Sequence, residues 1–296
     1  MILYELAIAP FQDYGFMRRA LIASVALGLS SGPIGVLLML RRMSLIGDAM
    51  SHAVLPGAAI GFMIAGTLSL PIMGLGALVA GLTVAILSGI VSRNTNLKED
   101  ASFASFYLAS LALGVLLISI KGSNIDLLHV LFGSILAIDA EALYLIGGIA
   151  SFSLILLTLI YRPLVVECFD PRFLRSVGGK GVIYHGIFLL MVVLNLVAGF
   201  QTLGTLMAVG MMMLPAVISQ LWAKTLPKMI AIATLSATLS GYLGLIISFQ
   251  LNFACGPTII LTATSLYILS LLFAPAGIFY KHLRQKTHST PMEIQQ

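Results

Sequence analysis

The sequence predicts an all-α, polytopic integral membrane protein with about eight or nine transmembrane helices. Three observations support this prediction: the composition, the long apolar segments and the placement of the basic residues. Only 9% of the 296 residues are charged, while 59% are hydrophobic. A water-soluble chain of this length would lack enough polar side chains to cover its surface, so a bilayer is the solvent that fits. We expect residues 1–296 to form a single transmembrane domain.

Apolar segments that are long enough to cross roughly 30 Å of hydrocarbon as helices recur along nearly the whole chain. No soluble domain fits between them. We expect no cleavable signal peptide, because the N-terminal residues lack a basic start followed by an apolar core. The predicted spans lie near residues 18–40, 45–66, 69–92, 101–120, 140–162, 181–200, 203–223, 229–250 and 257–279.

The basic residues predict how the chain is oriented in the membrane. If the loop 162–180 is cytoplasmic, only three of the 16 Lys and Arg residues lie outside, namely Arg18, Arg19 and Lys121. The positive-inside rule therefore predicts an outer N-terminus and an inner C-terminus, with a polar cytoplasmic tail at 281–296. The net charge of +5 would suggest nucleic acid in a soluble protein, but in a membrane protein the distribution of Lys and Arg matters more than their sum. Membrane lipid is therefore an expected partner, and nucleic acid is not.

Residues 41–61, RRMSLIGDAMSHAVLPGAAIG, place an acidic and an imidazole side chain in an otherwise apolar span. Asp48 and His52 are four residues apart, so on a helix they project from one face. An ionised side chain at membrane depth costs about 2.5–3.5 kcal/mol on insertion scales, which calls for a partner. Carboxylate oxygen and imidazole nitrogen are ligands for zinc, manganese and ferrous iron. A metal site is therefore one interpretation, beside a structural hydrogen bond and a proton relay.

Two further features lie close to, or outside, this span. Pro56 removes a backbone donor and can kink the helix, while Gly57 and Gly61 permit close contact between helices. In the outer segment between the fourth and fifth spans, Asp126 and His129 are three residues apart and could line a mouth for metal entry.

The loop after the fifth span reads RPLVVECFDPRFLRSVGGKG and predicts a short cytoplasmic helix over 171–177. Asp170 can cap this helix, with Pro171 at its first position, and Gly178 and Gly179 can end it. The helix is basic and amphipathic, so it suits contact with the membrane surface or docking into a partner. No Gly-x-x-x-x-Gly-Lys-Ser/Thr motif occurs in the chain, so ATP chemistry would have to come from another protein.

The sequence resembles the permease family of bacterial zinc, manganese and iron ABC importers. The resemblance covers nearly the whole chain and is most specific at residues 41–62, with support from KEDAS at 98–102, FDPRFLRSVG at 169–178 and QTLGTLMAVGMMMLPA at 201–216. It implies a multi-pass permease of the bacterial inner membrane, without catalytic residues or a permanently bound cofactor. The implied partners are an ABC ATPase subunit, an extracytoplasmic metal-binding protein, and a second permease copy, identical or related.

By this resemblance, Asp48 and His52 match the metal-contacting pair of the family. A segment at about 167–180 matches the part that couples to the ATPase, at Asp170, Pro171, Arg172, Phe173, Leu174, Arg175 and Gly178. Two copies of Asp48 and His52 across a dimer axis would supply two oxygens and two nitrogens, enough for a four-coordinate site. The resemblance favours zinc as the cargo, with manganese or iron as alternatives.

Two other functions are compatible with a polytopic membrane protein. A proton-coupled secondary metal transporter would use Asp48 as a titrating group, but the sequence lacks a convincing pair of broken helices in matching halves. An intramembrane metalloenzyme would be expected to carry a His-Glu-x-x-His motif, which is absent. The importer subunit is therefore the preferred interpretation, and no enzymatic activity is expected.

Overall fold

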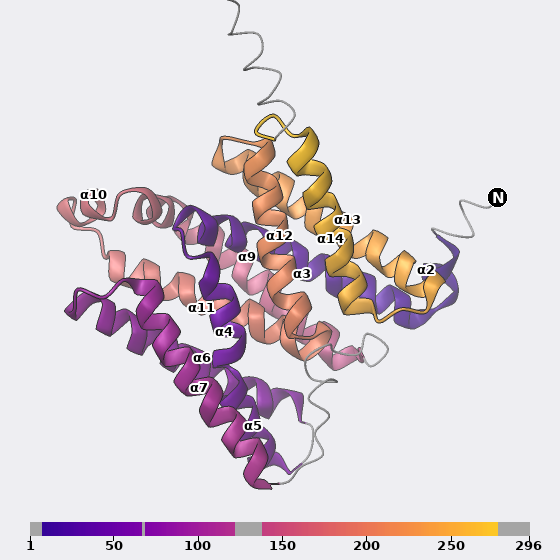
Figure 1. Cartoon of the computed structure of the whole chain (residues 1–296), viewed down its shortest axis with the longest axis horizontal. Helices are drawn as coiled ribbons and strands as arrows, with labels where there is room; N and C mark the ends of the chain where they lie inside the picture. Colours follow the sequence, from indigo (N-terminus) through magenta and orange to yellow (C-terminus); the bar gives the residue numbers. More distant parts are fainter. Residues whose placement is uncertain (1–7, 67–68, 122–137, 278–296) are drawn as a thin grey trace, which may run out of the picture.

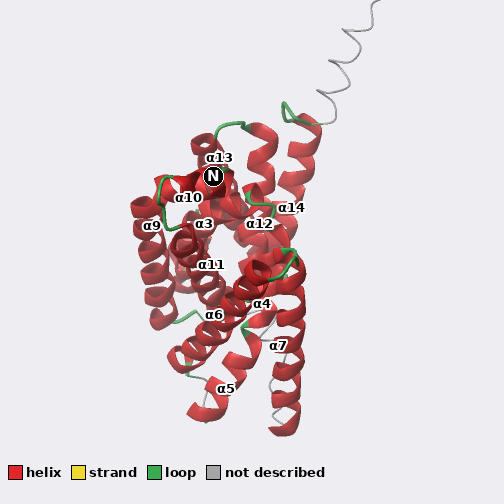
Figure 2. Cartoon of the chain, turned by 90° about the vertical axis from the view of Figure 1, so that its left-hand side faces the viewer, coloured by secondary structure: helices red, strands yellow, loops and turns green. Residues whose placement is uncertain are grey.

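The computed structural model describes residues 8–66, 69–121 and 138–277. Within these ranges every regular element is a helix, as Figure 2 shows. Nine helical stretches of the described chain are long and apolar enough to cross a membrane, and they coincide with the nine predicted segments. The prediction of an all-α polytopic fold is confirmed.

The first half of the chain forms four of these stretches, after a short helix that packs on the first of them. The second stretch consists of two consecutive helices. In chain order the elements are α2 (Ala9–Asp13), α3 (Gly15–Leu40), α4 (Ser44–Ala53), α5 (Leu55–Ala65), α6 (Leu70–Asn94) and α7 (Glu99–Lys121).

The second half forms the other five stretches and one short helix between two of them. These elements are α9 (Ala140–Phe169), α10 (Pro171–Ser176), α11 (Gly181–Leu203), α12 (Thr205–Trp222), α13 (Leu226–Leu251) and α14 (Cys255–Phe273).

The helices form two groups that meet along α11 (Figure 1). Helices α4 to α7 pack on one another, while α3 packs on α9, α12 and α13, and α14 packs on α12 and α13. Helix α11 contacts α4 and α6 of the first group and α3, α9 and α12 of the second. Its side chains Phe188, Val192 and Leu196 are at most 1% exposed, so α11 lies in the core that joins the groups.

Glycines allow α5 and α6 to approach closely within the first group. A Cβ added to Gly57 of α5 would overlap the carbonyl oxygen of Gly76 in α6, and a Cβ added to Gly76 would overlap that of Gly57. Gly61, one turn further along α5, also faces α6, and a Cβ there would lie 2.7 Å from the carbonyl oxygen of Ile72. Small residues therefore set the distance between these helices, as is common in membrane proteins.

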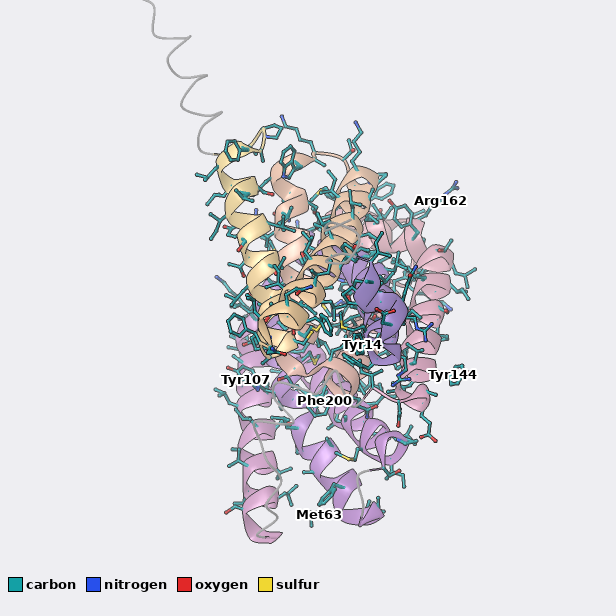
Figure 3. All side chains as sticks on the ribbon, turned by 90° about the vertical axis from the view of Figure 1, so that its right-hand side faces the viewer. Tyr14, Met63, Tyr107, Tyr144, Arg162 and Phe200 are labelled. Carbon is teal, nitrogen blue, oxygen red and sulfur yellow. The ribbon has the colours of Figure 1, made fainter. Side chains whose placement is uncertain are left out.

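The orientation in the membrane stays a prediction, and two features of the structure bear on it. In Figure 1 the helices α10 and α2 lie at opposite ends of the molecule. Figure 3 shows Tyr144 and Arg162 on the outside of α9, and Tyr144 is 80% exposed. A tyrosine near the predicted outer end and an arginine near the predicted inner end are the residue types that anchor a helix at membrane interfaces.

Candidate metal site and coupling segment

Asp48 and His52 lie on the same face of α4, as their spacing predicts. Nε2 of His52 is 3.9 Å from Oδ1 of Asp48, which is longer than an ordinary hydrogen bond. The side chain of Asp48 is 67% exposed and that of His52 is 33% exposed. The pair therefore lies on an open face of α4, where an ion or a second protein chain can reach both groups.

The face of α4 opposite to Asp48 and His52 is buried, and its packing determines where these two side chains point. Met50 is fully buried, and Ile46 is 1% exposed. A Cβ added at Gly47 would lie 2.6 Å from Cε of Met213 in α12, so α4 and α12 are in close contact there. Because this face is fixed against α12, Asp48 and His52 are turned away from the core.

The second membrane span is interrupted directly after His52. Helix α4 ends at Ala53, and α5 begins at Leu55 after the single residue Val54. Pro56 is at the second position of α5, where its missing N–H removes one backbone hydrogen bond. The hydroxyl of Ser110 in α7 donates a hydrogen bond to the carbonyl of Ala53 (2.8 Å). The ring of Tyr107, also in α7, stacks on that of His52 with 6.5 Å between centroids. Helix α7 therefore supports the break and one side of the candidate site.

Tyr107 and Ser110 were not predicted from the sequence. They lie more than fifty residues downstream of the pair, and their contacts depend on how α7 packs against α4 and α5. Such contacts leave no signal in local spacing, whereas the break itself has a local signal in Pro56.

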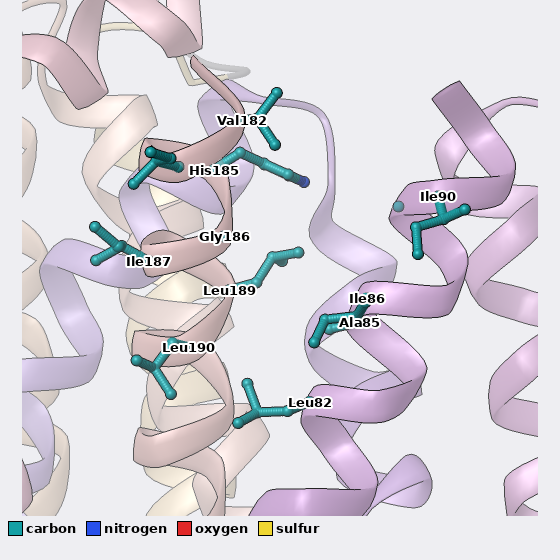
Figure 4. A pocket seen from close by; sticks show the side chains of 12 residues that line it. Leu82, Ala85, Ile86, Ile90, Val182, His185, Gly186, Ile187, Leu189 and Leu190 are labelled. Atoms are coloured by element: carbon teal, nitrogen blue, oxygen red, sulfur yellow. The ribbon is translucent and has the colours of Figure 1, made fainter. Parts of the chain in front are cut away.

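The described residues supply two candidate metal ligands at this place. Among them, no three His, Cys, Asp or Glu side chains come together in a way that could hold a metal ion. The predicted outer pair, Asp126 and His129, lies outside the described residues. A pocket of about 470 Å³ lies elsewhere, between α6 and α11, and is lined mainly by aliphatic side chains together with His185 (Figure 4).

The predicted helix in the loop after the fifth span is present as α10, one residue shorter than expected. Oδ1 of Asp170 accepts hydrogen bonds from the backbone N–H groups of Arg172 (3.1 Å) and Phe173 (2.9 Å), which confirms the predicted cap. Gly178 follows the helix with φ +78°, a left-handed conformation that glycine adopts without strain. Arg172 and Phe173 are exposed, and Phe173 is 56% exposed.

The structure keeps the two predicted sites on separate elements. Asp48 and His52 belong to α4, whereas the coupling segment joins α9 to α11. Helix α11 packs on α10 at its beginning and on α4 further along, so it lies between the two sites.

Comparison with known proteins identifies the family. Residues 13–274 match the ABC 3 transport family. The manganese import system permease protein ScaB of Streptococcus parasanguinis is 37% identical over 277 residues, which are 93% of this chain and 96% of ScaB. The chelated iron transport system membrane protein YfeD of Yersinia pestis is 31% identical over 283 residues, 96% of this chain and 91% of YfeD.

A solved structure has the same fold. PsaBC from Streptococcus pneumoniae in complex with Fab superposes with a TM-score of 0.82 at 34% sequence identity, covering 96% of this chain and 100% of that one. The match extends over almost all described helices, nine of which are apolar enough to cross a membrane. The chain is a multi-pass protein of the bacterial inner membrane and belongs to the ABC 3 transport family.

Proposed function

We propose that this chain forms the membrane pathway of an ATP-driven importer for divalent transition metals, with manganese as the first candidate cargo. The observation that carries the proposal is the Asp48–His52 pair, which is exposed on the apolar span Ser44–Ala65. An acidic side chain at this depth is costly unless it has a partner, and an ion passing through the membrane is such a partner. The two side chains are 3.9 Å apart, so no short hydrogen bond between them has to break before they bind an ion. Weak mutual contact suits a site that must also release its ion.

The choice of metal rests on ligand chemistry and on the relatives. Carboxylate oxygen and imidazole nitrogen suit manganese, ferrous iron and zinc. The relative at 37% identity is named for manganese import and the one at 31% for chelated iron transport. These names give no support to the zinc preference drawn from the sequence. We therefore rank manganese first, iron second and zinc third.

A second permease copy would complete the site. One chain offers Asp48 and His52, but a bound transition metal takes four or more ligands. The open face of α4 would meet the same face of a partner across a two-fold axis, and the two copies would then supply two carboxylates and two imidazoles. The 67% exposure of the Asp48 side chain supports this arrangement, since the chain leaves room for a partner there.

Two soluble partners would complete the importer. An ATPase subunit would bind α10, where a capped short helix presents the exposed side chains of Arg172 and Phe173. A metal-binding protein would deliver the ion at the opposite, outer end of the pathway. Helix α10 is held between two membrane-spanning helices, so it can transmit movement from a bound ATPase.

Metal uptake into vesicles tests this function. The chain is reconstituted with its candidate ATPase and metal-binding protein, and uptake of manganese, iron and zinc is measured with and without ATP. We expect ATP-dependent uptake that is largest for manganese. Uptake that ignores ATP and follows a pH gradient would instead identify a proton-coupled carrier.

The cap of α10 gives a further prediction. Asp170→Ala removes both hydrogen bonds at the start of the helix, and loss of such a cap weakens a helix by about 0.5–2 kcal/mol. We expect less ATPase subunit to co-purify with the permease, because a frayed α10 has to be ordered on binding.

Asp139→Ala is the matched control for this change. Asp139 caps α9 in the same way, accepting a hydrogen bond from the N–H of Ala142 (2.8 Å), but at the predicted outer end of the molecule. It should leave co-purification unchanged. If Asp170→Ala and Asp139→Ala reduce co-purification of the ATPase subunit equally, the effect is a general destabilisation. The result would then contradict α10 as the binding site of the ATPase.

A further inference from the structure

Glu167 is a buried carboxylate in the last turn of α9, just before α10. The residue is 7% exposed, and Oε2 has no hydrogen-bond partner within the described chain. Its carboxyl group lies directly against Gly181, the first residue of α11: a Cβ there would overlap Oε2 and lie 2.9 Å from Cδ. The N-terminus of a helix carries partial positive charge, so a carboxylate is favourable there. The carboxyl group of Glu167 therefore packs between the end of α9 and the start of α11.

The contact between Glu167 and Gly181 brings together the two ends of the segment that contains α10. Between Glu167 and Gly181, the end of α10 is closed by a hydrogen bond from the N–H of Gly179 to the carbonyl of Leu174 (2.8 Å). Gly178 takes the left-handed conformation that such a closure requires. A force applied to α10 therefore acts on the first turn of α11.

Arg41 connects the same part of α11 to the turn between α3 and α4. Phe188 lies about two turns beyond Gly181 and is fully buried. Cζ of Arg41 lies 5.8 Å from the centroid of the Phe188 ring, within the range of a cation–π interaction. Nη1 of Arg41 is buried and lacks a hydrogen-bond partner within the described residues. The guanidinium group is therefore sensitive to any shift of this ring.

Arg41 is also close in the chain to the candidate metal site. Arg42 has a φ of +59°, which is uncommon for a residue with a side chain, and α4 begins two residues later at Ser44. The turn is tight, because the N–H of Met43 donates to the carbonyl of Leu38 (3.0 Å). Displacement of Arg41 would therefore move the start of α4 and, with it, Asp48.

We propose that Glu167 and Arg41 are positioning residues that pass movement of the coupling segment, through the first two turns of α11, to the helix that carries Asp48 and His52. This inference rests on the proposed function. Glu167 is buried and Arg41 is half-buried, and each has one buried polar atom without a hydrogen-bond partner in the described chain. Electrostatic interactions are strong in such surroundings. Small changes in the spacing of α9, α11 and α3 therefore change the energy of both groups.

The test measures how many manganese ions are imported per ATP hydrolysed by the complete reconstituted transporter. Glu167→Gln replaces the carboxyl group by an amide of the same size, and Arg41→Gln replaces the guanidinium group by a shorter, neutral amide. We expect the ratio to fall about fivefold or more in each, the lower end of the range for coupling between sites. Phe188→Leu, which keeps both charges and removes the ring beneath Arg41, should lower the ratio in the same direction.

Two matched controls remove charges of the same kind from α9 without touching this connection. Glu141→Gln and Arg162→Gln change exposed residues and should keep the wild-type ratio. A wild-type ratio in Glu167→Gln, or in both Arg41→Gln and Phe188→Leu, overturns the proposal. So does a parallel loss of uptake and ATP hydrolysis, which is what a merely structural role predicts. Absence of ATP-dependent uptake in the wild-type transporter would contradict the proposed function itself.

Discussion

Asp48→Ala and His52→Ala should each lower manganese uptake by about 100-fold or more while the transporter still assembles. Even the outer-shell partners of metal ligands change affinity by about 10–100-fold when they are replaced, and these two residues are proposed as ligands themselves. If two copies share one site, each substitution removes two ligands at once. Neither side chain is buried, so truncation leaves no cavity in the core.

Uptake per assembled transporter is the quantity that checks this prediction. Leu45→Ala is a suitable control, because Leu45 lies one turn before Asp48 on the same face of α4 and is 72% exposed. It should keep near-normal uptake. If Asp48 and His52 only stabilise the helix packing, the variants will instead assemble poorly, and the transporters that do assemble will import manganese at the normal rate.

Much of the fold could be predicted from the sequence, because the bilayer imposes a length and an apolar composition on every span. All nine predicted segments are helices in the structure. The predicted ends of the spans were less accurate than their positions. The fifth span was predicted to end at Arg162, but α9 continues through Pro163 to Phe169. Leu164 is fully buried and Glu167 nearly so, and this packing extends the helix beyond the charged residue at which the sequence predicted its end.

The candidate site was only partly predictable, because part of it depends on packing between helices that are distant in the sequence. Asp48 and His52 are four residues apart, so their common face follows from helix geometry alone. The division of the span at Val54 agrees with the kink predicted from Pro56, because Val54 keeps a right-handed helical backbone and proline lacks the N–H of a continuous helix. The contact between Glu167 and Gly181 joins two helices across α10, and no local pattern in the sequence indicates it.

Gly57→Ala should destabilise the protein by about 1–3 kcal/mol or more, the usual effect of overpacking a close contact. The added methyl group would overlap the backbone carbonyl of Gly76, and backbone cannot move aside as a flexible side chain can. Helices α5 and α6 must therefore separate. Because α5 continues from the helix that carries Asp48 and His52, we also expect manganese uptake to fall.

Gly147→Ala in α9 is the matched control, since it makes the same change at a glycine with no atom within 4 Å of the added Cβ. Alanine is favoured over glycine inside a helix by about 0.5–1 kcal/mol, so this variant should be as stable as the wild type or more so. The stability of both variants is measured as the fraction of protein that stays monodisperse after heating in detergent. If Gly57→Ala lowers the stability and Gly147→Ala raises it, the α5–α6 contact requires glycine. A Gly57→Ala variant as stable as Gly147→Ala would mean that these helices can separate without loss, and that their spacing does not position the candidate site.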